Sequence, residues 1–205
     1  MVVTVITKQF LEYSSYAMAV LGLIGTFYYG VKATRLERLL RSFTWEDIDT
    51  GVRVLLRKVN RHGPPDVILT LSIPGQIISS LMMIHTLTPK TEYRAIRLDR
   101  HNNNLGKGKF IVIRTAKFAI GISREIVQDK TSRILIVDSA VVTGDLLSQT
   151  VSALVNAGIE RKQIVSASLL ATDFAIEGEK APDIYWQRVR DTNYRLPWGN
   201  LSGAW

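Results

Sequence analysis

The residues of this chain best suited to chemistry lie in a short loop around Asp138, Thr143 and Gly144. Asp138 ends the apolar segment RILIVD, the loop SAVVTGD follows, and Thr143 and Gly144 stand where the next helix is expected to begin. The start of a helix offers unpaired backbone N–H groups and a positive dipole end, which together bind anions. The spacing predicts an anion site beside a carboxylate. The alternative is that Thr143 only caps the helix and Gly144 only turns the chain.

A strand, a helix and a second strand are expected to hold this loop. The helical segment SQTVSALVNAG follows it, Gly158 is suited to end that helix, and an apolar strand is predicted over 163–170. Strand, helix and strand in this order predict a right-handed βαβ unit in a parallel sheet, where ligands bind at the carboxyl edge. The apolar face of the helix is predicted to comprise Leu147, Val151, Leu154 and Val155.

Earlier segments supply the other elements that are expected to pack around this unit. Thr44 and Asp47 are predicted to form a capping pair for a helix that should end near Asn60, before Gly63, Pro64 and Pro65. The segment DVILTLS predicts a buried strand that Pro74 and Gly75 terminate. Further predicted elements are a helix over 76–85, a strand over 93–98, a polar loop over 99–109, and strands over 110–115 and 118–123 joined by a hairpin.

Composition excludes several classes of site. The chain of 205 residues has no cysteine, which excludes disulfides, thiolate metal sites and a cysteine nucleophile. Its three histidines are not at metal-ligand spacing, so no metal site is predicted. The net charge of +8 is concentrated partly near the N-terminus, and the remainder is mildly basic. That balance does not by itself predict a nucleic-acid partner.

An uncharged segment near the N-terminus predicts a membrane-spanning helix over 13–31, YSSYAMAVLGLIGTFYYGV. A helix of nineteen residues is roughly 28 Å long, close to the ~30 Å hydrocarbon core. The alternatives are a buried core helix and a cleaved signal peptide, but basic residues follow the apolar run rather than precede it. The positive-inside rule then places the N-terminus outside and the C-terminal domain in the cytoplasm. The basic residues are Lys32, Arg35, Arg38 and Arg41.

The segment ILIVDSAVVTGDLL resembles the signature of type I phosphoribosyltransferases. In that family, acidic residues hold the ribose hydroxyls of phosphoribosyl pyrophosphate and the Thr-Gly loop binds its 5′-phosphate. The resemblance implies the same roles for the matching residues of this chain. Two flanking segments are similar to xanthine–guanine phosphoribosyltransferases, in the family's order: FTWEDIDTGVRVLLRKV…PDVILTLSIPGQIISSLM and the tail DIYWQRVRDTNYRLPWG. The resemblance covers 44–198 and implies an α/β fold, with a parallel sheet flanked by helices and a C-terminal hood over the base.

The expected organisation is therefore a tail (1–12), a transmembrane helix (13–31), a basic linker (32–43), the phosphoribosyltransferase-like domain (44–198) and a C-terminal tail (199–205).

The signature departs from the family's pattern at several contact positions. Asp138 keeps the first acid, but Ser139 replaces the second, Val142 stands where an acidic or hydroxylated residue is usual, and Leu146 replaces a threonine. Asp145 lies in the first turn of the predicted helix, where it would repel a phosphate. Two unit charges ~5 Å apart at an effective dielectric of ~20 interact by roughly 3 kcal/mol. Asp145 avoids this repulsion only if its side chain points outward.

The other two contact regions depart as well. The pyrophosphate loop corresponds to Ser72, Ile73, Pro74 and Gly75, so an isoleucine replaces the expected arginine and a proline removes a backbone donor. A leaving pyrophosphate needs such donors in the transition state. Leu170 takes the place of the lysine that reads the purine. In the hood, Asn193 and Tyr194 are the base-facing candidates, of which Tyr194 can still stack.

Several other polar residues are weaker candidates. The loop over 102–109 is expected to be either a solvated connection or a lid whose Lys107 and Lys109 contact an anion. His85 is expected to be structural, and nothing in the sequence brings Asp99 and His101 to Asp138. The arginines in the middle of the chain are expected to form a solvated face rather than a nucleotide or nucleic-acid patch: Arg94, Arg97, Arg100, Arg114 and Arg124.

The departures predict a catalytically impaired protein that binds a nucleotide-like ligand or a protein partner, and the apolar segment over 13–31 predicts that it is anchored in a membrane. The resemblance further implies homo-oligomers. The architecture suits a signalling or antiviral effector in a bacterium. The alternative is an active purine phosphoribosyltransferase that uses phosphoribosyl pyrophosphate and Mg²⁺, with Asp138 assisting the metal. No other cofactor is predicted.

Overall fold

The computed structural model describes residues 26, 41–85, 92–95, 97–99, 110–114 and 119–199. The chain divides into two units, 1–41 and 42–205, and the second contains the folded domain. Within the described residues, no helix is both long and apolar enough to cross a membrane. The predicted span over 13–31 lies outside those residues except for Thr26, and it stays a prediction.

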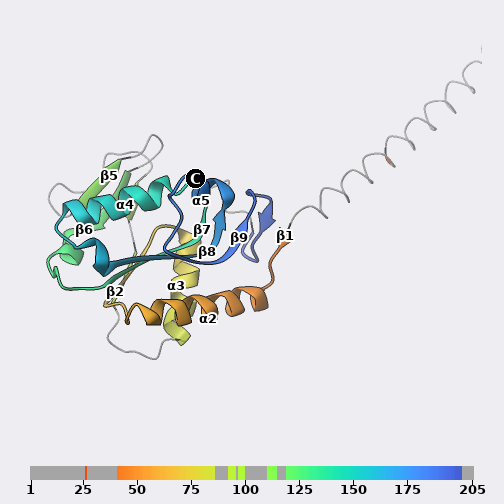
Figure 1. The fold of residues 1–205 in the computed structure, drawn as a ribbon, viewed down its shortest axis with the longest axis horizontal. Helices are drawn as coiled ribbons and strands as arrows, with labels where there is room; N and C mark the ends of the chain where they lie inside the picture. Colours follow the sequence, from red (N-terminus) through yellow and green to blue (C-terminus); the bar gives the residue numbers. More distant parts are fainter. Residues whose placement is uncertain are drawn as a thin grey trace, which may run out of the picture. The chain divides into compact units, whose positions relative to one another are not determined.

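The domain is built on a five-stranded parallel sheet in the order β3-β2-β7-β8-β9 (Figure 1). The chain runs outward from β2 to β3, returns to the other side of β2 as β7, and continues to β8 and β9. The direction of winding therefore reverses between β2 and β7. The strands are β2 (Val67–Thr70), β3 (Glu92–Ala95), β7 (Ile134–Val141), β8 (Ile164–Thr172) and β9 (Ile184–Val189).

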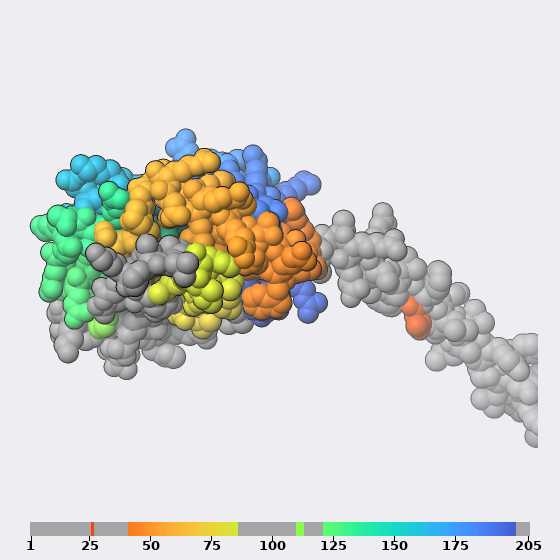
Figure 2. All heavy atoms as spheres, turned by 90° about the horizontal axis from the view of Figure 1, so that it is seen from below, coloured from red at the N-terminus to blue at the C-terminus, as the bar shows by residue number. Residues whose placement is uncertain are grey.

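Helices cover both faces of this sheet (Figure 1). On one face α2 (Trp45–Arg61) and α3 (Ile73–His85) pack side by side, as Figure 2 shows from below, and Nε2 of His85 lies 2.7 Å from Oδ1 of Asp49 between them. His85 therefore joins two helices, in agreement with the structural role expected for it. On the other face lie α4 (Asp145–Asn156), α5 (Asp173–Glu177) and the short 3-10 helix η1 (Arg124–Val127).

Alternating side chains of the central strand feed two separate apolar cores. Leu135 and Val137 of β7 join the core under α2 and α3, whereas Ile134 and Ile136 join the core under α4. All four are at most 1% exposed. A strand buried on both faces is typical of parallel sheets. The continuous apolar segment before Asp138 is therefore explained by its position in the middle of the sheet.

The start of α2 follows the sequence prediction closely. Thr44 is the N-cap, and its side chain accepts a hydrogen bond from the backbone of Asp47 while the Asp47 carboxylate accepts one from the backbone of Thr44. This reciprocal capping box satisfies two of the N–H groups that a helix start leaves unpaired. The helix ends at Arg61, one residue beyond the expected Asn60.

Two smaller sheets complete the described part of the chain. One joins β1 (Arg41–Ser42) to β10 (Tyr194–Arg195), and the other is antiparallel in the order β4-β6-β5. The prediction of a single strand over 93–98 was wrong, because β3 ends at Ala95 in the parallel sheet and a new strand begins at Arg97 in the antiparallel one. Its strands are β4 (Arg97–Asp99), β5 (Phe110–Arg114) and β6 (Ala119–Ser123).

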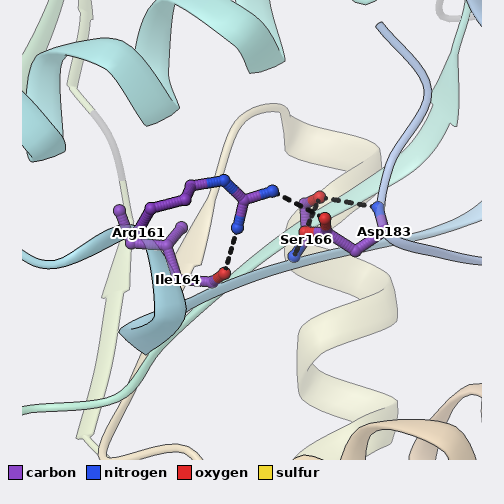
Figure 3. Close-up of polar contacts among 4 residues, drawn as sticks. All are labelled: Arg161, Ile164, Ser166 and Asp183. Atoms are coloured by element: carbon purple, nitrogen blue, oxygen red, sulfur yellow. Dashed lines mark hydrogen bonds and ion pairs between the residues drawn. The ribbon is translucent and has the colours of Figure 1, made fainter. Parts of the chain in front are cut away.

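One polar network holds the starts of β8 and β9 together at the amino edge of the sheet (Figure 3). Asp183 precedes β9, and its Oδ2 accepts hydrogen bonds from the backbone N (2.8 Å) and the hydroxyl (2.7 Å) of Ser166 in β8. Arg161, at the start of η2 (Arg161–Gln163), donates to Oδ1 of Asp183 and to the carbonyl of Ile164, both at 2.6 Å. These bonds align the start of β9 with β8.

Candidate functional site

A cavity of about 350 Å³ opens at the carboxyl ends of β2 and β7, where the winding of the sheet reverses. Loops that follow neighbouring strands diverge at such a point, and the crevice between them is the usual ligand site of open α/β sheets. Here the loops run from β2 into α3 and from β7 into α4, and the segment around β10 closes the third side. The wall from β7 is continuous from Asp138 to Gly144.

Asp138 and Ser72 join the two loops across the floor of this cavity. The hydroxyl of Ser72 donates to Oδ1 of Asp138 at 2.5 Å and accepts a hydrogen bond from the backbone N of Gly75 at 2.9 Å. Oδ1 of Asp138 also accepts from the backbone N of Ser139 at 2.7 Å. Two backbone N–H groups that could have faced a ligand are therefore already bonded within the protein.

Burial makes Asp138 a weak acid for its type. It raises the pKa of this carboxyl to about 6, although the hydrogen bonds from Ser72 and Ser139 act in the opposite direction. Burial, together with the charge of Asp138, also raises the pKa of the Tyr194 hydroxyl to about 12. Tyr194 therefore stays neutral at physiological pH, whereas Asp138 changes its charge near pH 6.

The start of α4 forms the second wall of the cavity. Gly144 is the N-cap residue with a φ of 73°, a left-handed conformation that side chains disfavour. Its Cα faces the carbonyl of Lys180 so closely that a Cβ at this position would overlap with it. The Thr143 hydroxyl accepts a hydrogen bond from the backbone N of Asp145 at 3.3 Å. The backbone turn at 143–145 is thus supported from behind by the segment that follows α5.

Asp145 points away from the cavity and toward Lys180. The Nζ of Lys180 lies 2.6 Å from Oδ1 of Asp145, and Asp145 does not line the cavity. The hydrogen bond from Lys180 lowers the pKa of the Asp145 carboxyl below its usual value. The repulsion of a phosphate that the sequence analysis expected is therefore largely relieved, because the carboxylate is turned outward and paired.

Aromatic side chains form part of the cavity wall. Tyr194 and Trp198 line it together with Thr192 and Leu196. Trp198 in turn packs against Trp45, with ring centroids 5.7 Å apart and planes inclined by 57°. An aromatic wall of this kind can stack on a flat heterocycle.

Comparisons with known proteins place this architecture. No protein-family model and no curated protein matches the sequence. Among solved structures, the chain is similar to a purine phosphoribosyltransferase from Pyrococcus horikoshii, with 20% identity, a TM-score of 0.57, and coverage of 78% of this chain and 93% of that one. A xanthine-guanine-hypoxanthine phosphoribosyltransferase from Helicobacter pylori has 16% identity, a TM-score of 0.59, and coverage of 80% and 96%. The domain has the type I phosphoribosyltransferase fold.

A third similar structure was solved with a ligand. It is a hypothetical protein from Neisseria gonorrhoeae with bound ppGpp, with 16% identity, a TM-score of 0.56, and coverage of 78% of this chain and 89% of that one. At these identities the likeness concerns the fold.

Most of the residues singled out from the sequence line the cavity of this phosphoribosyltransferase fold. They come from both loops and from the segment around β10: Ser72, Pro74, Asp138, Ser139, Val142, Thr143, Gly144, Leu146 and Tyr194. Gly75 is buried just behind Ser72, to which its N–H donates. The lining residues that the sequence analysis did not name include Leu71, Thr192, Leu196 and Trp198. The Pro-Trp ending of the hood-like tail was the available signal for Trp198.

Besides Asp145 and Gly75, three predicted site residues lie outside the cavity lining. Leu170 is fully buried in the core, because β8 runs on to Thr172 through its pairing with β9 and so does not end at Leu170. Asn193 is exposed and bonds to Asp191 through both its backbone and its side chain. Ile73 is the first residue of α3, is 60% exposed and does not line the cavity. The loop over 102–109 lies outside the described residues.

The described residues do not themselves form a metal site in this fold. No cluster of three or more potential metal ligands occurs among them. Asp138 is the single carboxylate among the described residues that line the cavity, and its Oδ1 already accepts two hydrogen bonds. Mg²⁺ prefers several oxygen ligands in octahedral geometry. This donor set does not fit a Mg²⁺ ion held by the protein alone.

Proposed function

We propose that this protein uses a phosphoribosyltransferase fold to bind a nucleotide-like ligand and does not catalyse phosphoribosyl transfer. The observation that carries the proposal is the hydrogen bond between Ser72 and Asp138. It joins the two loops that would have to engage opposite ends of phosphoribosyl pyrophosphate, and it engages Asp138 directly.

The loop before α3 is poorly equipped to hold a leaving pyrophosphate. The N–H of Gly75 is bonded to Ser72, Pro74 has no N–H, and the exposed Ile73 supplies no charge. The described residues that line the cavity include no lysine, arginine or histidine. Charge that develops on a leaving group is stabilised by preorganised donors and cations, and loss of one such donor costs about 10²–10³ in rate.

The rest of the cavity suits a purine mononucleotide. Tyr194 and Trp198 offer an aromatic surface for the base, and the start of α4 at Thr143 and Gly144 offers backbone donors for a phosphate. The outward pairing of Asp145 with Lys180 supports this assignment, because it removes an unpaired negative charge from that end. The bound ppGpp in the similar protein from Neisseria gonorrhoeae also supports a nucleotide as the ligand class.

Calorimetry on the full-length chain in a non-ionic detergent tests this proposal. We expect binding of GMP or AMP, and neither binding of phosphoribosyl pyrophosphate with Mg²⁺ nor release of pyrophosphate when a purine base is added. Thr143→Glu should abolish mononucleotide binding, because it puts a negative charge in the cavity wall. Ser148→Glu, exposed one turn further along α4, is the charge-matched control and should bind like the wild type.

A second pair of variants asks whether only the loops have diverged. Ile73→Arg combined with Asp145→Gly supplies the arginine that the family resemblance implies at 73 and removes the negative charge at 145. Ile84→Arg with Asp145→Gly is the control, because it adds the same charge at the other end of α3. Gain of phosphoribosyl pyrophosphate binding in the first variant alone would show that the remaining cavity still accepts that ligand. Pyrophosphate release by the wild type would instead overturn the proposal in favour of an active transferase, and no binding of any nucleotide would favour a protein-interaction module.

The apolar segment over 13–31 supports the further proposal of a single-pass membrane protein with a cytoplasmic C-terminal domain. The absence of cysteine makes the test simple, because Thr4→Cys and Ser202→Cys each introduce a unique thiol. In intact bacterial cells, a membrane-impermeant maleimide should label the first variant and not the second. Equal labelling of both only after cell lysis would contradict the orientation.

Light scattering on the purified chain tests the proposed homo-oligomer.

A further inference from the structure

A second cavity, of about 510 Å³, lies at the amino edge of the parallel sheet. Its walls come from the end of α2, the turn after it, the turn that leads into β7, and the 3-10 helix that leads into β8. The candidate nucleotide site is at the other end of β7, which has eight residues and is roughly 25 Å long. We call this second cavity the amino-edge cleft. It shares no lining residue with the first.

Two basic side chains line the amino-edge cleft, and each of them packs over a glycine that leaves room for it. Arg133 packs its guanidinium over Gly63, and Lys130 packs its Nζ over Gly158. Both glycines have a left-handed φ, of 92° and 99°. A Cβ at Gly63 would overlap with the Arg133 guanidinium, and one at Gly158 would lie 3.2 Å from the Lys130 Nζ. The turns thus hold both cations at the cleft.

The acidic residues next to these cations are bonded to other groups. Asp129 accepts hydrogen bonds from the backbone and hydroxyl of Thr131 and from the hydroxyl of Ser132, and the bonds from Thr131 lower the pKa of its carboxyl. Asp66 accepts from the backbone N of Arg133 at 2.8 Å. Within the part of the chain that the structure describes, neither the Lys130 ammonium nor the Arg133 guanidinium forms an ion pair or a side-chain hydrogen bond.

The other charged residues that line the cleft are Glu160 and Lys162, which are paired at 2.6 Å and largely cancel. Lys130 and Arg133 therefore leave the lining with a positive charge. Val59, Leu135 and Val165 form an apolar floor. Cations that line a cavity and form no ion pair with the protein favour a multiply charged anion.

We propose that the amino-edge cleft is a second binding site, in which Lys130 and Arg133 hold a phosphate group. Arg133 presents the planar donors that suit phosphate oxygens, and Lys130, which also lines the cleft, supplies a point charge. The phosphate can belong to a soluble phosphate ester or to an anionic lipid headgroup, which share this chemistry. The site does not depend on the function proposed for the first cavity.

NMR titration of the full-length chain with inorganic phosphate, in phosphate-free buffer and a non-ionic detergent, tests this assignment. We expect saturable shifts of the amide signals of Gly63 and Gly158, and an affinity that falls about tenfold or more in the double variant Lys130→Met, Arg133→Met. Arg57→Met with Arg124→Met removes the same two charges from exposed positions that line neither cavity, and it should bind phosphate as the wild type does.

Three results would overturn the proposal. The first is an unchanged phosphate affinity in the double variant Lys130→Met, Arg133→Met. The second is an equal loss of phosphate affinity in the control Arg57→Met, Arg124→Met, which would indicate an effect of general surface charge. The third is that phosphate shifts only the amide signals of Thr143 and Gly144. The last result would assign the anion to the first cavity alone.

A further titration separates the two sources of phosphate. Phosphoserine carries a phosphate monoester, whereas glycerophosphoserine reproduces the phosphodiester of a lipid headgroup. Binding of phosphoserine alone would support a soluble phosphate ester, and equal binding of both would support a lipid headgroup. Binding of neither, with inorganic phosphate also inert, would contradict the site.

Discussion

The hydroxyl of Ser72 lies 2.5 Å from Oδ1 of Asp138, although 66 residues separate the two in the chain. This hydrogen bond connects the start of α3 to the end of β7 at the floor of the candidate nucleotide site. The bond engages the carboxylate that a transferase would need, and it lies where the loop before α3 meets the end of β7.

Replacement of the Ser72 hydroxyl should change the acidity of Asp138. The hydrogen bond from Ser72 lowers the pKa of Asp138 against the effect of burial, so Ser72→Ala should raise that pKa above its value of about 6. NMR titration of the side-chain carboxyl carbon measures it. Ser80→Ala is the matched control, because the Ser80 hydroxyl donates only to Gln76 within the same helix. An unchanged pKa in Ser72→Ala would show that the bond does not persist in solution.

Stability should fall as the pH rises through the range in which Asp138 ionises. Its pKa is raised from 3.8 to about 6 in the folded protein, so the folded state binds more protons than the unfolded state between these values. The free energy of unfolding should therefore decrease by up to about 3 kcal/mol from pH 4 to pH 7 on account of this group. Asp138→Asn keeps the acceptor oxygen and removes the titration. Urea unfolding of both proteins across this range should show that the wild type loses stability relative to Asp138→Asn as the pH rises. A difference in unfolding free energy that does not change with pH would contradict the raised pKa.

The polar network at the amino edge of β9 should contribute to stability in the opposite sense. Burial raises the pKa of Asp183, but the bonds from Ser166 and Arg161 outweigh it and leave the pKa lowered. The contribution is therefore present above the unfolded pKa near 3.8 and is lost as the pH falls below it. Asp183→Ala should cost about 2 kcal/mol at pH 7, because three donors lose their acceptor.

An exposed ion pair provides the comparison for Asp183. Asp173 contacts Arg188 at 2.6 Å on the surface, and Asp173→Ala should cost less than about 1 kcal/mol. Chemical denaturation at pH 7 and at pH 3 measures both variants. Equal losses in Asp173→Ala and Asp183→Ala at pH 7 would mean that the Ser166 network adds nothing beyond a surface charge pair.

The turn before α4 should tolerate no side chain at Gly144. An alanine there must adopt a φ near 73° and its Cβ must also displace the Lys180 carbonyl, so we expect a loss of more than about 2 kcal/mol in unfolding free energy. Gly199→Ala is the matched control, since Gly199 has a φ of 83° but nothing within 4 Å of the added Cβ. It should cost only about 1–2 kcal/mol. Thermal unfolding of both variants tests whether the close approach of Lys180, beyond the backbone conformation, fixes this turn.

Local patterns in the sequence were sufficient for the elements whose interactions are local. The capping box at Thr44 spans three residues, the strand before Asp138 is a continuous apolar segment, and Gly158 stops α4 just where a left-handed residue is needed. These features join residues that are close together in the chain, so the local sequence is enough to predict them. For the same reason the resemblance of ILIVDSAVVTGDLL to the phosphoribosyltransferase signature pointed to the correct fold.

The sequence could not decide features that depend on how separate elements meet. The end of β8 at Thr172 follows from its pairing with β9, and this placed Leu170 in the core rather than at the site. The side chain of Asp145 is turned outward by its ion pair with Lys180, which lies 35 residues away in the chain and is not predictable from local sequence. The bond between Ser72 and Asp138 likewise requires β2 and β7 to be neighbours. Strand order and loop contacts arise from burial of the whole sheet, so only the tertiary structure showed which of the candidate residues share a cavity and which are already bonded to one another.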